Sequence, residues 1–333
     1  MEEYGITQYK IQPNRYSPIP PWKLPCIDHC QTPINSKRDL EDIVVCTEFL
    51  KHMEEHRGSV FIFTDGSKSN AGVGFGAVSK DFNRYGALPK CASIFTAELH
   101  AILIALKQIV SLSERRFVIF SDSRSALQAL EMYNSLHPLI MEILEWMILA
   151  RRKGKEITFC WIPAHVGIVG NEKADELAKF AALKLAPKDI ALPSGDYFPV
   201  IRAAVQSSWQ FMWELEDRNK MREIASNIFP WKYYNMARRK ETALCRLRIG
   251  HTRLTHGFLM SRDPPPFCED CLVPQTVRHL LVECPSLTEA RHHFLIDCKN
   301  AEGDYVLHNI IGKDFNEFSL FGFLIEIGVL EQL

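Results

Sequence analysis

The sequence lacks the features that would assign it to a membrane or secreted class. No apolar run approaches the roughly 20 residues that a membrane-spanning helix needs. The first ten residues, MEEYGITQYK, are polar and acidic and have no secretory signal character. The ten cysteines are scattered apart from one cluster near the carboxyl end, which favours a reducing compartment over a disulfide framework. We therefore expect a protein of the nucleus or cytoplasm, with no membrane partner.

Net charge is nearly absent as well. The chain has 39 Lys and Arg residues against 40 Asp and Glu residues, a formal net charge of −1. Any surface that attracts nucleic acid must therefore come from local clusters of basic residues. The sequence also contains no internal repeat, no low-complexity tract and no Asp–Asp pair of the kind that a polymerase active site requires.

The distribution of proline and apolar residues predicts four segments. Residues 1–56 are expected to form an extended, proline-rich tether and a short helix. Residues 57–185 should form the first compact domain. Residues 186–260 begin with a boundary rich in proline and small residues and continue as a helical, partly basic linker. Residues 261–333 should hold a zinc-binding module and carboxyl-terminal helices.

The compact domain has a recognisable order of elements. Strands are expected at 60–63, 72–78, 84–88, 116–122 and 156–162, and helices at 94–110, 123–131, 138–152 and 171–185. Three early strands followed by alternating strands and helices predict an α/β fold, with a mixed sheet and helices on its faces.

An aspartate follows the apolar run of two of these strands, Asp65 in FTDGS and Asp122 in FSDSR. If the two strands are parallel neighbours, both carboxylates emerge where open sheets place their active sites. Glu98 lies in the first turns of the 94–110 helix among apolar residues, and Asp175 lies one turn into the last helix. Four converging acids without a Cys or His ligand set suit a hard ion such as Mg²⁺. Such sites often hold two ions about 4 Å apart and drive in-line attack on phosphodiesters.

Four segments, FTDGS, TAELHAI, FSDSRSAL and WIPAHVGIVGNEKADELAK, resemble the four motifs of ribonuclease H type 1. They are most similar to the domains of arthropod non-LTR retrotransposons, over residues 58–185. The resemblance implies the ribonuclease H fold, a five-stranded mixed sheet whose first three strands are antiparallel. It also implies hydrolysis of the RNA strand of RNA–DNA hybrids with two Mg²⁺ ions, which Mn²⁺ can replace, leaving 5′-phosphate and 3′-hydroxyl ends.

The resemblance also implies a role for each catalytic residue. Asp65 would bridge both metal ions. Glu98 and Asp122 would complete the ion on the leaving-group side, and Asp175 would help to hold the ion that carries the attacking water. His165, in PAHVG, matches a loop histidine that shuttles protons or eases product release.

Some positions depart from the family pattern. Ile94 and Phe95 stand where other members carry asparagines that contact RNA 2′-hydroxyls, and Arg124 stands where some carry glutamine. Recognition of RNA is therefore expected to depend largely on backbone groups, with help from Ser67, Asn70 or Arg124. The basic protrusion of some members is also missing, because EMYNSLHP contains no lysine or arginine.

A second cluster lies near the carboxyl end. Cys268, Cys271, His279 and Cys284 are spaced C-x2-C-x7-H-x4-C, which suits one tetrahedral, structural Zn²⁺ ion. The cluster resembles the small zinc-binding region found after the reverse transcriptases of the same elements. Before it, Arg246, Arg248 and Arg253 recur along a basic segment and are expected to contact phosphates, with an ordinary solvated face as the alternative.

The sequence therefore predicts an endoribonuclease acting on RNA–DNA hybrids, from the carboxyl-terminal part of a retrotransposon polyprotein. Its expected partners are the hybrid, single-stranded nucleic acid or RNA of the element, and a reverse transcriptase supplied by the parent element. Two alternatives are a catalytically inactive nucleic-acid-binding protein of the same origin and a DNA-acting transposase or resolvase of the same fold. The order of the four acids and the loop of His165 argue against the transposase.

Overall fold

The chain divides into two compact units, residues 1–203 and 204–333. The computed structural model describes residues 10–14, 20, 22, 28–30, 42–132, 135–216, 219–231 and 235–333. Much of the tether predicted for residues 1–56 lies outside the described residues. In the part of the chain that is described, no helix combines the length and the apolar character needed to cross a membrane. The finer division into four segments stays a prediction.

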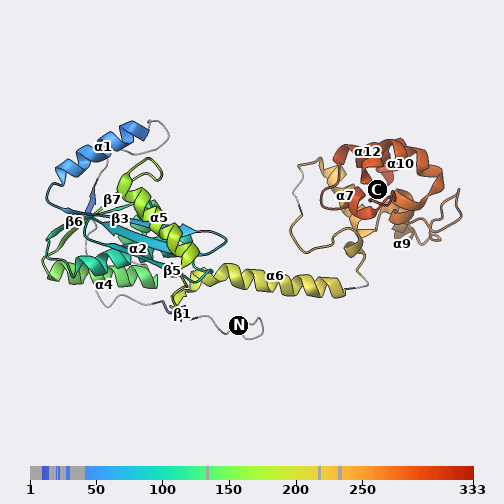
Figure 1. Cartoon of the computed structure of the whole chain (residues 1–333). Coiled ribbons are helices and arrows are strands. Elements are labelled where there is room, and N and C mark those ends of the chain that lie inside the picture. The colour runs from blue at the N-terminus through green and yellow to red at the C-terminus, as the bar shows by residue number, and fades with distance from the viewer. Residues whose placement is uncertain are drawn as a thin grey trace. The chain divides into compact units, whose positions relative to one another are not determined.

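The first unit is built on one mixed sheet, in the strand order β2-β7-β6-β3-β4-β5 (Figure 1). Its strands are β2 (Asp28–Cys30), β3 (Val60–Lys68), β4 (Val73–Ser79), β5 (Asn83–Leu88), β6 (Arg116–Ser121) and β7 (Glu156–Trp161). β4 runs antiparallel to β3 and β5, whereas β6 runs parallel to β3 and β7. This confirms the predicted α/β fold with five strands. β2 adds a short sixth strand, parallel to β7, from the segment predicted as a tether.

Helices cover both faces of this sheet (Figure 1). α2 (Ile94–Ile109), α3 (Arg124–Glu131) and α4 (Pro138–Arg152) pack on one face, and α1 (Asp42–Glu55) and α5 (Val169–Lys184) pack on the other. Since successive side chains of a strand point to opposite faces, β3 sends Ile62 to the α2 side and Phe63 to the α5 side. A small second sheet pairs β1 (Ile11–Gln12) in parallel with β8 (Leu192–Pro193).

The backbone of α5 lies directly against β4. A Cβ added to Gly74 would lie 2.2 Å from the carbonyl oxygen of Ala178, and one added to Gly76 would lie 2.6 Å from that of Ala174. Such contacts are shorter than any side chain allows, so glycine is required at both positions. The sequence GVGFG thereby fixes how closely α5 approaches the sheet.

The second unit is mainly helical over its described residues, as predicted. α6 (Phe198–Leu215) begins in the first unit and continues into the second. The helices that follow are α7 (Arg238–Ile249), α8 (Arg253–His256), α9 (Phe258–Ser261), α10 (Thr288–Phe294), α11 (Leu307–Ile311) and α12 (Glu317–Glu326). Leu247, Leu281 and Phe323 are buried in its core. A short π-helical turn, His279–Glu283, precedes α10.

Candidate active site and metal centres

Asp65 lies where the sheet divides. The parallel pairing of β3 with β6 ends at Thr64 and Ser121, while the antiparallel pairing with β4 continues through Asp65 to Lys68. The apolar pattern suggested that the strand ends before Asp65. In the structure only its pairing with β6 ends there, after Thr64, and the strand itself continues to Lys68. The Asp65 side chain, 6% exposed, is held rigidly by a paired strand at the opening between β3 and β6.

Glu98 reaches Asp65 because α2 approaches β3 closely. A Cβ on Gly66 would lie 2.7 Å from the backbone nitrogen of Glu98, so this approach requires glycine. The backbone N–H of Gly66 donates a hydrogen bond to the Glu98 carboxylate. The start of α2 is fixed by Ser93, whose hydroxyl accepts from the N–H of Thr96 at 3.1 Å.

A buried aspartate that we did not predict reinforces this helix start. The Oδ1 atom of Asp196 accepts hydrogen bonds from the N–H of Ser93 at 3.1 Å and from the hydroxyl of Thr96 at 3.0 Å. The negative charge of the Asp196 carboxylate also interacts favourably with the positive end of the dipole of α2. Residues beyond the predicted boundary at 185 thus help to position Glu98.

Asp122 follows β6 and is held from two sides. Its Oδ2 atom accepts a hydrogen bond from Nδ2 of Asn171 at 3.1 Å, and its carbonyl oxygen accepts one from Nε1 of Trp161 at 3.0 Å. Asn171 is 2% exposed and lies in the first turn of α5. Asn171 was not among the predicted site residues. Its position at the start of the helix that carries Asp175 could have indicated that it lies near the acids.

The loop before α5 and its first turns carry the remaining acids. His165, Glu172 and Asp175 bring one ligand atom each within 4.8 Å of one another, and so do Asp65, Glu98 and Asp122. His165 is exposed and has a left-handed backbone conformation, with φ of 56°. Of these six, Glu172 is the residue that the sequence did not single out.

The carboxylates raise one another's pKa values. Burial, followed by the charges of Asp122 and Asp175, raises the pKa of Asp65 to about 8. Burial and then the charges of Asp65 and Asp122 raise the pKa of Glu98 well above its usual value. Burial also raises the pKa of Asp122, which the hydrogen bond from Asn171 opposes. Such a cluster favours protons or bound cations over open carboxylates.

Unpaired oxygen atoms within the cluster fit a divalent cation. Oδ2 of Asp65 and Oε2 of Glu98 are buried and have no hydrogen-bond partner among the described residues. Buried carboxylate oxygens without a donor are costly. An all-oxygen set of this kind is what Mg²⁺ and Mn²⁺ prefer, so the residues present fit the implied ions.

The predicted nucleic-acid contacts of this unit lie beside the acids. Ser67 is half-buried two residues after Asp65, and Asn70 is exposed in the turn after β3. Arg124 is exposed at the start of α3, with its guanidinium 4.4 Å from the ring centre of Trp161. All three are thus in the unit that carries the acidic cluster.

Cys268, Cys271, His279 and Cys284 converge in the second unit, with ligand atoms within 4.8 Å of one another. Sγ of Cys284 lies 3.9 Å from that of Cys268 and 3.7 Å from that of Cys271. Tetrahedral zinc with Zn–S bonds of about 2.3 Å requires sulfur separations of about 3.8 Å. Nε2 of His279 is buried and has no hydrogen-bond partner among the described residues. The four residues therefore fit one Zn²⁺ ion.

The arginines predicted to contact phosphate differ in their surroundings. Arg248 donates to the carbonyl oxygens of Ile311 and Gly312, each at 2.8 Å, and its guanidinium lies 4.1 Å from the ring centre of Trp231. Arg246 donates to the Leu333 carbonyl oxygen at 2.5 Å. Both side chains thus stabilise the second unit internally.

Arg253, by contrast, is exposed at the start of α8. Of the three arginines, it is the one that the structure presents to solvent. A phosphate contact by Arg246 or Arg248 would compete with the internal hydrogen bonds of these side chains.

Comparison with known families agrees with this geometry. Residues 57–183 match the family model of RNase H. The match covers β3 to α5, which carry all the acids of the cluster. The chain therefore contains an RNase H domain, and a domain of this family implies binding of RNA–DNA hybrids and hydrolysis of their RNA strand.

Proposed function

We propose that the RNase H domain at residues 57–183 makes this chain an endoribonuclease that cuts the RNA strand of RNA–DNA hybrids with two divalent metal ions. The observation that carries the proposal is the convergence of Asp65, Glu98 and Asp122 at the opening between β3 and β6. The carboxylates of α5 and the exposed His165 support it, because Asp175 acts electrostatically on Asp65 and His165 on Asp122.

The residues would divide the work as follows. Asp65, at the centre, would contact both ions; Glu98 and Asp122 would complete one of them and Asp175 the other. Bound divalent ions would activate the attacking water and stabilise the leaving 3′ oxygen. Asn171 would hold Asp122 in the orientation that its hydrogen bond fixes. His165, exposed in its loop, would carry protons between the site and bulk water.

Contacts to the hybrid would involve Ser67, Asn70 and Arg124. Arg124 has the side chain best suited to a phosphate or ribose contact, because its guanidinium is exposed and rests on Trp161. The exposed Arg253 would make a phosphate contact of its own in the second unit. Such contacts make affinity fall with salt.

We further propose that the chain derives from a retrotransposon of the arthropod non-LTR type. An RNase H domain followed by a Cys₃His cluster supports this origin. A reverse transcriptase of the parent element would then supply the hybrid, and single-stranded nucleic acid or element RNA would be a second partner. The zinc ion would stabilise the second unit rather than take part in hydrolysis.

The test is incubation of the full chain with RNA–DNA hybrid, duplex DNA and duplex RNA, each strand labelled separately, with and without Mg²⁺. We expect Mg²⁺-dependent cutting of the RNA strand of the hybrid, giving 5′-phosphate ends. Asp122→Asn should remove nearly all turnover, while Asp81→Asn, an exposed aspartate between β4 and β5, should not. Cutting of duplex DNA would instead support a transposase or resolvase. Binding without any cutting would support an inactive relic.

A further inference from the structure

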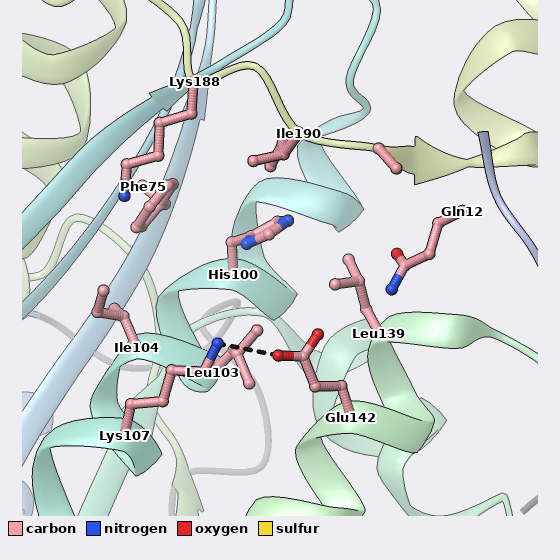
Figure 2. A pocket seen from close by; sticks show the side chains of 11 residues that line it. Gln12, Phe75, His100, Leu103, Ile104, Lys107, Leu139, Glu142, Lys188 and Ile190 are labelled. Atoms are coloured by element: carbon pink, nitrogen blue, oxygen red, sulfur yellow. Dashed lines mark hydrogen bonds and ion pairs between the residues drawn. The ribbon is translucent and has the colours of Figure 1, made fainter. Parts of the chain in front are cut away.

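The first unit contains a cavity of about 350 Å³ apart from the acidic cluster. It lies between α2, α4 and the chain segment around Ile190, and β1 reaches it with Gln12 (Figure 2). His100, which lines it, is two residues after Glu98 on α2, so the two side chains leave the helix in different directions. A volume near the lower end of the usual range for ligand sites, about 300 to 1,000 Å³, suits a small molecule.

The walls of this cavity are largely apolar and partly aromatic. Leu103, Leu139 and Ile190 line it, and the rings of His100 and Phe75 stack with centres 5.5 Å apart and an angle of 28° between their planes. Flat, mostly apolar ligands bury well against such walls.

Charge is largely balanced around the cavity. Nζ of Lys107 lies 2.9 Å from Oε1 of Glu142, the ion pair drawn as a dashed line in Figure 2. Nζ of Lys188 lies 5.4 Å from the ring centre of Phe75. Lys188 is itself exposed to solvent, and Glu142, the one carboxylate of the lining, is paired with Lys107. An uncharged ligand therefore suits the interior better than an ionic one.

Two residues that line this space each have a polar atom without a hydrogen-bond partner among the described residues. Oε1 of Gln12 and Nε2 of His100 are both buried and have no hydrogen-bond partner among the described residues. Figure 2 shows the two side chains on different sides of Leu139. A buried polar atom destabilises the fold if nothing satisfies it. They come from distant parts of the chain, β1 and α2, which β1–β8 pairing brings together.

We propose that this cavity binds a nucleobase, its flat ring packing against the apolar walls and its polar edge hydrogen-bonding to Gln12 and His100. Nucleobases combine a flat, uncharged ring with donors and acceptors on one edge, which is what these walls and these two atoms complement. The base could belong to a free nucleoside or to an unpaired nucleotide of a strand, and the test separates these sources. The proposal is independent of the proposed nuclease activity, because none of the acids lines the cavity.

The test is calorimetric titration of the full chain with adenosine, guanosine, cytidine and uridine. The Asp65→Asn variant in buffer without Mg²⁺ is used, so that neither Mg²⁺ binding nor turnover at the acidic cluster contributes to the measured heat. We expect saturable binding of at least one nucleoside with one site per chain. His100→Phe, which keeps an aromatic ring but removes the nitrogen atoms, and Gln12→Leu should each weaken it at least tenfold. Gln108→Leu, on α2 but outside the cavity lining, should leave it unchanged.

Two further ligands complete the experiment. Indole, a flat ring with no acceptor atom, should bind at least tenfold more weakly than the best nucleoside. The last ligand is a short single-stranded oligonucleotide containing the preferred base. If the natural ligand is a base within a strand, the oligonucleotide should bind more tightly than the nucleoside. If the natural ligand is a free nucleoside, the oligonucleotide should not compete with the nucleoside for the cavity. If circular dichroism shows that the His100→Phe protein does not fold, the effect of Gln12→Leu on nucleoside binding still tests the proposal.

Three outcomes would overturn the proposal. One is the absence of saturable binding by all four nucleosides. Another is binding that both substitutions leave intact, or that indole matches. The third is a crystal structure, grown with the preferred nucleoside, in which only ordered water contacts Gln12 and His100. Hydrogen-bonded water is the natural competitor for such atoms.

Discussion

Nζ of Lys179 lies 2.7 Å from Oδ2 of Asp175, one turn earlier on α5. The lysine side chain is 56% exposed, whereas the aspartate side chain is 12% exposed. Lys179 also acts electrostatically on Asp65, lowering its pKa against the effect of the neighbouring carboxylates. The ammonium group of Lys179 thus forms an ion pair with a carboxylate that we assign to metal binding. Lys179 and a divalent metal ion should therefore compete for Asp175.

We predict that Lys179→Met strengthens Mg²⁺ binding. An ion pair of this exposure contributes up to about 1 kcal/mol, which corresponds to about a fivefold change in dissociation constant. Calorimetric Mg²⁺ titration without substrate measures it, and Lys179→Arg, which keeps the charge, serves as control. Equal or weaker Mg²⁺ binding by the Met variant would show that the lysine does not compete.

We predict that Asp65 makes stability depend on pH when divalent ions are absent. Its pKa is about 8 in the folded chain against an ordinary 3.8, so between these values the folded state holds a proton that the unfolded state releases. The free energy of unfolding should therefore fall as pH rises from about 4 to about 8. Thermal melting across this range in Mg²⁺-free buffer without a chelator, which leaves the predicted zinc site loaded, should show the decline in wild type.

Asp65→Asn should reduce that decline, leaving the part due to the raised pKa values of Glu98 and Asp122. It should melt several degrees above wild type at pH 8, since about 1 kcal/mol shifts the melting temperature by about 2–4 °C. Asp81→Asn is the matched control, because Asp81 is exposed. Mg²⁺ should reverse the order by stabilising wild type alone. Identical pH profiles for wild type and Asp65→Asn would contradict the assignment of a buried, protonated Asp65.

We predict that Asn171 acts by positioning Asp122. Asn171→Ala should slow hybrid cleavage about 10- to 100-fold, the usual effect of losing a partner of a metal ligand. It should also move the acidic limb of the pH–rate profile to higher pH, because the hydrogen bond that opposes the raised pKa of Asp122 is lost. Asn83→Ala, at an exposed position of β5, is the control. A slower rate without a shifted limb would point to a merely structural role.

We predict that His165→Ala slows turnover about 100-fold, since proton transfer typically contributes that much or more. His165→Asn separates the imidazole from the backbone, because asparagine tolerates the left-handed conformation that His165 adopts. Both variants should be equally slow if the imidazole acts in catalysis. Comparing single-turnover with steady-state rates distinguishes proton transfer from product release. An asparagine variant as fast as wild type would assign the effect to backbone geometry.

We predict one zinc ion per chain, bound by Cys268, Cys271, His279 and Cys284. Elemental analysis of the purified protein measures it, and Cys268→Ser with Cys271→Ser should abolish it, while Cys245→Ser, at an exposed cysteine, should not. Since His279 and Cys284 border the buried Leu281, chelation should lower the melting temperature of the second unit. Mg²⁺-dependent cleavage should survive. Full zinc occupancy in the double variant would refute these ligands.

The sequence was sufficient for the strands and helices of the first compact domain and for acids that converge there, because amphipathic periodicity and motif order are local properties. The sequence was insufficient where contacts between residues far apart in the chain determine the structure. The apolar run before Asp65 predicted a strand end, yet pairing with β4 extends the strand to Lys68. The sequence also did not indicate that Arg248, predicted to contact phosphate, donates hydrogen bonds to the carbonyl oxygens of Ile311 and Gly312, over 60 residues away. Asn171 and Asp196 were missed for the same reason, since their partners are distant in sequence.

The glycines of β4 have a consequence for the catalytic cycle. Because α5 contacts this strand backbone to backbone, no rotamer change at their interface can alter the separation of Asp175 from Asp65. We expect any adjustment to occur instead in the loop before α5, which carries the exposed His165. Loop movements occur within nanoseconds to microseconds, whereas shifts of packed elements take microseconds to milliseconds. The acids would thus stay fixed from one turnover to the next, while His165 samples many positions within each.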